Sequence, residues 1–130
     1  MDAINRFLSN DRFSAHVGIQ LVEVSPGHAK ATLEVSAKHL NGVGIAHGGA
    51  IFSLADFVFA AASNAYGTVA VAINASISFV KAVRGGVLTA EAREVSRNPK
   101  LATYAIEIHD AAGEIVASFQ GMVYRKQDPL

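Results

Sequence analysis

The sequence predicts an α+β fold in which an antiparallel sheet curls around one buried helix. Two observations lead to this prediction. Residues 50–66 contain no proline or glycine and are apolar almost all the way round a helix, which is typical of a helix inside a protein. Much of the remaining sequence alternates apolar and polar residues with the period of two that marks half-buried strands.

The N-terminal third predicts a short helix, two strands and a loop. Apolar residues recur at helical spacing within residues 2–9, and two strand patterns between residues 19 and 35 flank the turn-forming cluster Ser25–His28. A glycine-rich loop at residues 38–49 leads into the central helix, for which Gly67 is a stop signal.

After Gly67 the period changes from helix to strand. Residues 69–79 predict a long strand with one apolar face and one small, partly polar face, which Gly85 and Gly86 end. Three further alternating segments follow at residues 87–97, 101–109 and 114–125. We expect these four strands to form a meander with hairpin connections, which gives a sheet of about six strands in total.

Composition narrows the class of protein. A length of 130 residues predicts one domain over residues 1–130, and 51% apolar with 17% charged residues argues against disorder. Eleven basic and eleven acidic residues give no overall attraction to nucleic acid or to an acidic membrane. The apolar share favours a subunit interface, although apolar residues scattered over the surface are an ordinary alternative.

Features of secreted and membrane proteins are missing from the sequence. The chain has no cysteine, so it has no disulfide, cysteine nucleophile or thiolate metal site. The N-terminus lacks the apolar core of a signal peptide, and the most apolar region, residues 50–62, is shorter than the roughly 20 residues of a membrane span. We therefore expect a cytoplasmic protein that does not bind membranes.

Asp56 is the most informative polar residue, because it falls in the middle of the apolar helix. An unpaired buried carboxylate costs on the order of several kcal/mol, or its pKa rises until it is neutral. Asp56 is therefore paired, faces a polar cavity or is functional. Ser53 and Ser63 extend a narrow polar stripe along the same face. A structural aspartate bonded to backbone or hydroxyl groups is the alternative.

The junction of loop and helix is the second candidate site. At Gly48 and Gly49 the first helical N–H groups lack partners, and glycine lets a ligand approach the backbone, so this place could hold an anion or an oxyanion. A glycine-rich helix entry with nothing bound is the alternative. His47 by itself is more often structural than catalytic, and Asn41 is either a left-handed turn residue or a polar group directed at a substrate.

Other enzyme signatures are absent. The five histidines show no metal-ligand spacing, so no metal site is expected, and the sequence has no phosphate-binding loop or GxSxG elbow. Arg84, Arg97 and Lys100 are ordinary surface charges or contacts for an anionic ligand.

Residues 41–60 resemble the acyl-CoA thioesterases of the hotdog superfamily, in particular the PaaI-like group of phenylacetic acid degradation. That group carries the pattern N-G-x-x-x-x-H-G-G-x-x-x-x-L-x-D. The matching residues here are Asn41, Gly42, His47, Gly48, Gly49, Leu54 and Asp56. The order of the expected elements agrees with the hotdog fold over nearly the whole chain.

The resemblance implies a hotdog fold, whose sheet wraps around one long helix at about residues 49–66. It implies a homodimer, often paired into a homotetramer. It also implies hydrolysis of an aryl- or medium-chain acyl-CoA, for example a phenylacetyl-CoA-like substrate, to free acid and CoA. Coenzyme A is then part of the substrate, and no metal or redox cofactor is required.

The resemblance also implies roles for individual residues. The Gly48 N–H would polarise the thioester carbonyl, and Asp56 would act as general base on water or as nucleophile. Asn41 and His47 would orient the substrate, the water or the loop, and Gly49 is expected to contact the substrate.

One feature departs from the family pattern. Several similar enzymes present a serine or threonine to the active site from the strand after the helix. The counterpart here is Ala72, and Asn74 and Ser76 are expected on the same strand face as substrate contacts. The candidates for contacts to the CoA nucleotide are Arg84, Arg97 and Lys100.

Gly48 and Asp56 are eight residues apart, or about 12 Å along a helix axis. One carbonyl cannot easily meet both, because attack needs contacts near about 3 Å. The two groups of one chain are therefore expected to serve different sites. A two-fold dimer with antiparallel helices would bring Gly48 of one chain to Asp56 of the other, which predicts an inactive monomer.

Two other functions remain as alternatives. One is a non-catalytic acyl-CoA-binding protein, since a fold does not determine a function. The other is an acyl-thioester dehydratase or hydratase, which usually employs a histidine and a carboxylate in one site. The presence of both Asp56 and the His47-Gly48-Gly49 segment favours hydrolysis.

Overall fold

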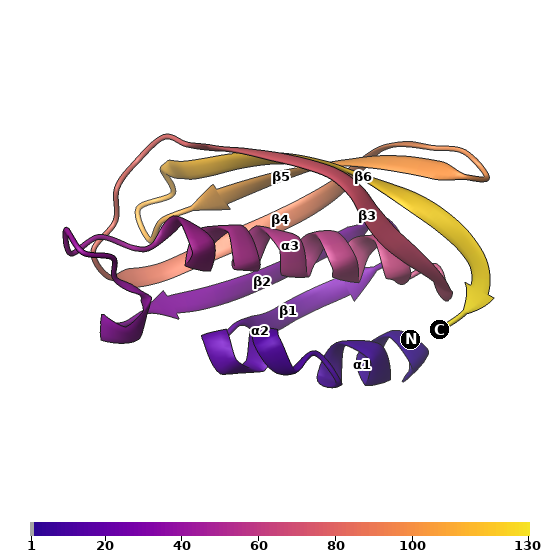
Figure 1. The fold of residues 1–130 in the computed structure, drawn as a ribbon, viewed down its shortest axis with the longest axis horizontal. Helices are drawn as coiled ribbons and strands as arrows, with labels where there is room; N and C mark the ends of the chain where they lie inside the picture. Colours follow the sequence, from indigo (N-terminus) through magenta and orange to yellow (C-terminus); the bar gives the residue numbers. More distant parts are fainter. Residues whose placement is uncertain (1) are drawn as a thin grey trace.

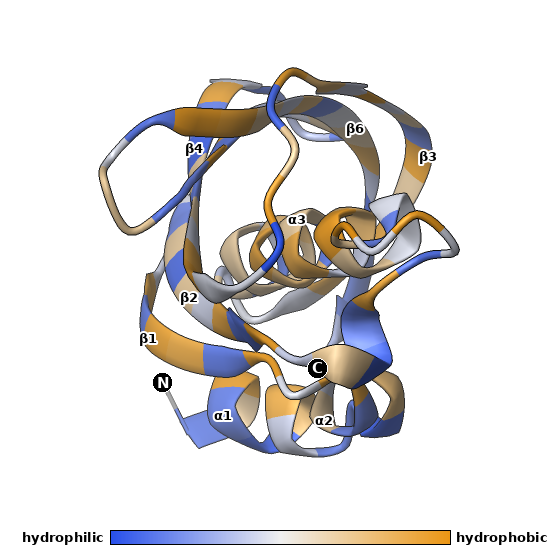
Figure 2. Cartoon of the chain, turned by 90° about the vertical axis from the view of Figure 1, so that its left-hand side faces the viewer, coloured by the Kyte–Doolittle hydropathy of each residue, from blue (hydrophilic) through white to orange (hydrophobic). Residues whose placement is uncertain are grey.

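A long helix held in the hollow of a curved antiparallel sheet organises the fold (Figure 1). The structure, a computed structural model, describes residues 2–130. Helix α3 (Gly48–Asn64) lies between the sheet and two short helices, α1 (Asp2–Ser9) and α2 (Arg12–Val17). Figure 2 looks along α3 and shows the sheet arching over one side of it, with α1 and α2 on the other. This arrangement confirms the predicted α+β fold.

Six strands form one sheet, as predicted. They are β1 (Gln20–Ser25), β2 (His28–Val35), β3 (Thr68–Phe79), β4 (Gly86–Arg97), β5 (Leu101–His109) and β6 (Ile115–Pro129). Their order across the sheet is β1-β2-β4-β5-β6-β3, and every neighbouring pair is antiparallel. Strands β1 and β3 are therefore its two edges.

The predicted four-stranded meander is wrong at its first connection. Strand β3 pairs with β6, and β4 pairs with β2, so no hairpin joins β3 to β4. The backbone of residues 80–83 makes other hydrogen bonds instead. Val80 and Lys81 donate to the carbonyl of Val116, and the carbonyl of Val83 accepts from Ala46. These bonds lead the chain from the edge strand past the start of α3 to β4, which lies inside the sheet between β2 and β5.

Helix α3 packs closely against the sheet because many side chains on the inner face of the sheet are small. Its fully or almost fully buried alanines are Ala29, Ala31, Ala90, Ala92, Ala102 and Ala117. Phe59 of α3 fills the remaining space and packs edge-on against Tyr104 and Phe119, with ring centroids 5.7 and 5.5 Å away. An ideal Cβ on Gly121 of β6 would lie 2.6 Å from the Phe59 ring, so the sheet needs glycine at this point.

The boundaries of α3 differ slightly from the expected residues 49–66. The helix ends at Asn64 because this buried side chain bonds to the start of β3, accepting the Ala70 N–H at 2.9 Å. Its Nδ2 donates to the carbonyl of Ala60, one turn back in the helix, at 2.9 Å. Gly67 lies just beyond, with a φ of 94° that favours glycine.

Helix α1 matches the predicted helix, whereas α2 was not predicted. Asp11 begins α2 as its N-cap, since its side chain accepts the Ser14 N–H at 3.0 Å. Gly18 ends α2 with a φ of 98°. An aspartate and a glycine at this spacing are cap signals, but six helical residues carry too little apolar periodicity to reveal a helix. None of the helices among residues 2–130 combines the length and apolar character needed to cross a membrane.

We expect Gly121→Ala to lower the free energy of unfolding by about 1–3 kcal/mol, since the new methyl group overpacks the buried Phe59 ring. The lower backbone entropy of alanine in the unfolded chain offsets only about 0.5–1 kcal/mol of this loss. Urea denaturation measures the difference. Gly85→Ala is the matched control, because a Cβ there meets nothing within 4 Å. Equal unfolding midpoints for the two variants would show that the sheet does not need glycine at position 121.

Candidate active site

Helix α3 begins with a hydrogen bond from its own N-cap. His47 has an extended backbone (φ −63°, ψ 136°), and its Nδ1 accepts the Gly49 N–H at 2.8 Å. Because Nδ1 is the acceptor, the neutral ring carries its proton on Nε2. The Gly49 N–H, expected to contact substrate, is thereby bonded to the protein.

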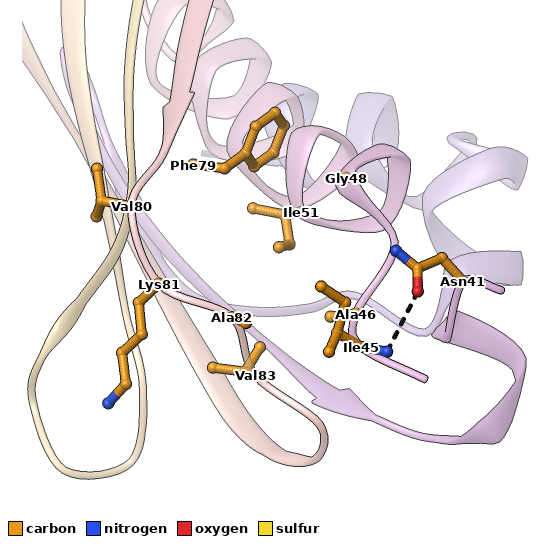
Figure 3. A pocket seen from close by; sticks show the side chains of 10 residues that line it. All are labelled: Asn41, Ile45, Ala46, Gly48, Ile51, Phe79, Val80, Lys81, Ala82 and Val83. Carbon is orange, nitrogen blue, oxygen red and sulfur yellow. Dashed lines mark hydrogen bonds between the residues drawn. The ribbon is translucent and has the colours of Figure 1, made fainter. Parts of the chain in front are cut away.

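The Gly48 N–H is available to a ligand. Among the hydrogen bonds of residues 2–130, none uses this N–H, which lies at the positive end of α3. Gly48 lines a pocket of about 380 Å³ (Figure 3). The other residues that line it are Asn41, Ile45, Ala46, Ile51 and residues 79–83. An ideal Cβ on Gly48 would lie 3.2 Å from the ring of Phe79, which lines the same pocket, so a larger residue here would push on that ring.

Asn41 shapes the loop beside this pocket. Its Oδ1 accepts the N–H groups of Val43 and Ile45 at 3.0 and 3.2 Å, and Figure 3 shows the second of these bonds. The left-handed alternative is wrong, because only glycines have positive φ among the described residues. Arg84 lies over the same loop, with a guanidinium nitrogen 3.4 Å from the carbonyl of Gly44.

Asp56 lies on the side of α3 that faces away from the sheet. Of the possibilities left open for Asp56, the single chain shows a side chain that is exposed and faces a pocket, although the helix around it is mostly buried. It lines an open pocket of about 320 Å³. The other residues that line this pocket are Asp11, Phe13, Ser14, Phe52, Ser53 and Phe57. Desolvation by these neighbours, and then the charge of Asp11, raise the pKa of Asp56 above its usual value.

The hydroxyl groups of the predicted polar stripe do not pair with Asp56. Ser53 donates to the carbonyl of Gly49 at 2.7 Å, and buried Ser63 donates to the carbonyl of Phe59 at 2.8 Å. No hydrogen bond or ion pair of residues 2–130 involves the Asp56 side chain. The structural alternative, in which backbone or hydroxyl groups hold Asp56, therefore fails.

Gly48 and Asp56 line different pockets that have no residue in common. His47 lines a third pocket of about 270 Å³, which meets the Asp56 pocket at Phe13 and Ser53. None of these pockets of the single chain contains both the free N–H and the carboxylate, as the spacing along the helix predicts.

Asn74 and Ser76 lie elsewhere. They pair with Met122 and Gln120 and line a pocket of about 300 Å³ formed by residues of β3, β4, β5 and β6. A register shift lies between Ala72 and Asn74 and breaks the strand's alternation there. Asn74 and Ser76 therefore share a face with each other, as their common pocket shows, but not with Ala72 as predicted. The structure thus brings neither Asn74 nor Ser76 to Asp56.

Arg97 and Lys100 lie near the opposite end of α3 from Gly48. Arg97 pairs with Glu94 at 3.2 Å and stacks over the Tyr66 ring at 4.5 Å, just beyond the end of the helix. Lys100 belongs to the turn before β5, where its N–H donates to Asn98. Of the three predicted nucleotide contacts, only Arg84 lies near the Gly48 end of the same chain.

Two residues of this region were missed from the sequence. Buried His39 accepts the Ser36 N–H, donates from Nε2 to the carbonyl of Val17 at 2.6 Å, and accepts the His47 N–H on its own carbonyl. It joins α2 to the start of α3. Asp11 was missed because α2 was missed, although an aspartate before a helix is a recognisable cap signal.

Comparisons with known proteins find the same family by sequence and by structure. The profile of the Thioesterase superfamily matches residues 43–117. A putative esterase of Archaeoglobus fulgidus is 43% identical over 117 residues, which cover 89% of this chain and 76% of the relative. The acyl-coenzyme A thioesterase PaaI of Escherichia coli is 38% identical, with 89% and 84% covered. The structure of the E. coli PaaI protein from the phenylacetic acid degradation operon has a TM-score of 0.94 at 34% identity, covering 98% of this chain and 94% of that one.

We expect Asp56→Asn to be more stable than the wild type at neutral pH. The raised pKa means that the folded chain disfavours the charged carboxylate, whereas the asparagine avoids this cost. Below the usual aspartate pKa the protonated Asp56 of the wild type and the asparagine of the variant are both neutral, so the stability advantage of the variant disappears. It grows as pH rises through the usual pKa and is complete above the raised one.

Urea denaturation at acid and neutral pH measures this difference. Glu34→Gln, which removes an exposed carboxylate from β2, controls for net charge. An advantage of Asp56→Asn that is the same at both pH values contradicts a raised pKa in the folded chain.

Proposed function

The chain belongs to the thioesterase superfamily of hotdog-fold proteins, and we propose that it hydrolyses an aryl- or medium-chain acyl-CoA to free acid and CoA. Membership confirms the family resemblance of residues 41–60 and the prediction of a thioester hydrolase. One observation carries the proposal: helix α3 presents both a Gly48 N–H and an Asp56 carboxylate that make no hydrogen bond within the described chain.

The proposed reaction begins with the Gly48 N–H donating to the thioester carbonyl oxygen. Asp56 accepts a proton from water, and the water oxygen attacks the carbonyl carbon. The negative charge that develops on the carbonyl oxygen is stabilised by the N–H and the positive end of α3. The C–S bond then breaks, the CoA sulfur takes up the proton from Asp56, and the free acid leaves. No metal or redox cofactor enters this scheme.

The raised pKa of Asp56 supports the role of general base, because a base with a pKa nearer to neutrality removes a proton more readily. The Nδ1 bond of His47 and the turn held by Asn41 support roles in ordering the loop around the N–H. Direct attack by the Asp56 carboxylate is the variant of this scheme, with an acid anhydride as its intermediate.

We propose an aryl acyl group, with a phenylacetyl-CoA-like thioester as the first substrate to test. Support comes from the pocket of Asp56, where the phenylalanines Phe13, Phe52 and Phe57 offer apolar surface to an aromatic ring. The similarity to a protein of a phenylacetic acid degradation operon supports the same choice.

The complete site requires two chains in this proposal. Strand β3 is an edge of the sheet and exposes large apolar side chains, namely Val71, Ile73 and Phe79. A second copy that pairs along this edge would cover them, and two-fold symmetry would bring its Asp56 towards the Gly48 pocket. We propose a homodimer of this kind, with pairing of two dimers into a tetramer as a further step.

Thiol release from a panel of acyl-CoAs tests the function. We expect turnover by the wild type, greatest with aryl-acyl substrates, and a fall in kcat of about 10²–10⁴-fold in Asp56→Asn with little change in binding. Binding without thiol release from any acyl-CoA would indicate a non-catalytic acyl-CoA-binding protein. Unchanged turnover in Asp56→Asn would remove Asp56 from the mechanism.

Gly48→Pro removes the proposed oxyanion donor with little disturbance of the helix. Proline is favoured at the first helical position, and the extended His47 before it suits a residue that precedes proline. We expect kcat to fall by about 10²–10³-fold. Gly48→Ala is the control, since it adds a similar contact with Phe79 but keeps the N–H. Equal losses in both variants would show that the N–H is not the donor.

The same variants test the shared site. A mixed dimer of Asp56→Asn and Gly48→Pro chains, purified through a different tag on each chain, contains one complete site if the sites are shared. We therefore expect about half the wild-type activity per dimer. An inactive mixed dimer would mean that both groups act within one chain.

A further inference from the structure

The pocket of Asp56 holds a second carboxylate, that of Asp11, for which the proposed reaction has no use. Helix α3 supplies Phe52, Ser53 and Phe57 to the walls of this pocket. The opposite wall comes from the corner between α1 and α2, where Asp11, Phe13 and Ser14 lie. Two acidic groups therefore share about 320 Å³ of partly aromatic surroundings.

Asp11 is held in place by four hydrogen bonds around one turn. Its Oδ1 accepts the Ser14 N–H at 3.0 Å, and its carbonyl accepts the Ser14 hydroxyl at 3.1 Å and the Ala15 N–H at 3.3 Å. Its own N–H donates to the carbonyl of Leu8 at 3.1 Å. Leu8 is buried in the core, so this corner is attached to the body of the protein.

Asp11 is the charged group that acts most directly on Asp56. The described residues contribute no other titratable side chain to this pocket. The titratable groups of the neighbouring pocket are His16 of α2, Lys38 and His39 of the short 3-10 helix Ala37–His39, and His47. The Lys38 ammonium group bonds there to the carbonyl of His16. The sheet strands packed against α3 contribute no residue to the Asp56 pocket.

We propose that Asp11 is a positioning residue that makes Asp56 a stronger base for the attacking water. This inference rests on the role of Asp56 in the proposed function. Two negative charges that line the same pocket repel each other, and a proton moving from water to Asp56 relieves the repulsion. Asp11 touches neither the thioester nor the leaving group in this scheme. The raised pKa of Asp56, to which the charge of Asp11 contributes, agrees with it.

Asp11→Asn tests the proposal, because it removes the charge and keeps the helix cap. Asparagine caps helices about as well as aspartate, so the unfolding midpoint should be retained. We expect the acid limb of the kcat/KM profile to move to lower pH. We also expect plateau kcat to fall by about tenfold or less, well short of the loss in Asp56→Asn, with KM unchanged. Glu23→Gln, which removes an exposed carboxylate from β1, is the control for net charge.

The titration of Asp56, followed by carbon-13 NMR of labelled aspartate carboxyls, gives a reading that does not require activity. We expect the titration midpoint of Asp56 to move to lower pH in Asp11→Asn and to be the same as in the wild type in Glu23→Gln. The proposal fails if Asp11→Asn leaves both the Asp56 midpoint and the acid limb unchanged. Asp11 would then act only as a helix cap, and only Asp11→Ala would lose stability. Full activity of Asp56→Asn would overturn the proposed function instead, while the NMR titration would still decide how Asp11 acts on Asp56.

Discussion

The packing of α3 against the alanine-rich inner face of the sheet determines where every other part of the site lies. Small side chains at positions such as Ala31, Ala90 and Ala92 let the helix approach closely, and Phe59 occupies the space above Gly121. Dense cores of this kind do not rotate or slide freely, because a small shift produces overlap or a cavity. The rotation of α3 about its axis is thereby fixed, and it turns Asp56 away from the sheet.

This rotation separates the two groups of α3 on which the proposed reaction depends. The Gly48 N–H is at the end of α3, beside the crossing segment at residues 80–83. Asp56 lies two turns further along α3, in a pocket whose opposite wall comes from the start of α2. A rigid helix keeps such groups apart, so the proposed reaction requires a second copy of the chain. The exposed apolar edge at β3 offers the surface along which two copies would meet.

The corner between α1 and α2 both caps a helix and lines the pocket of Asp56. Buried Leu8 attaches the corner to the core, and the cap made by Asp11 starts α2. The same residues carry a charge and an aromatic ring to the face of α3 that holds Asp56. A capping carboxylate normally stabilises only its own helix. Here the capping carboxylate also lies beside a second carboxylate, so its charge acts on Asp56 of the neighbouring helix.

The sequence by itself determined the local features: the apolar helix, the strand limits of residues 101–109, the glycine-rich helix entry and the family motif. Local spacing suffices for these because helix and strand periods are properties of neighbouring residues. Only the tertiary structure decided that β3 pairs with β6, that Asp56 is exposed and that Asp11 lies beside it. Alternation shows which residues share a face of a strand. It cannot show which strand or helix lies next to that face, because contacts between distant segments decide this.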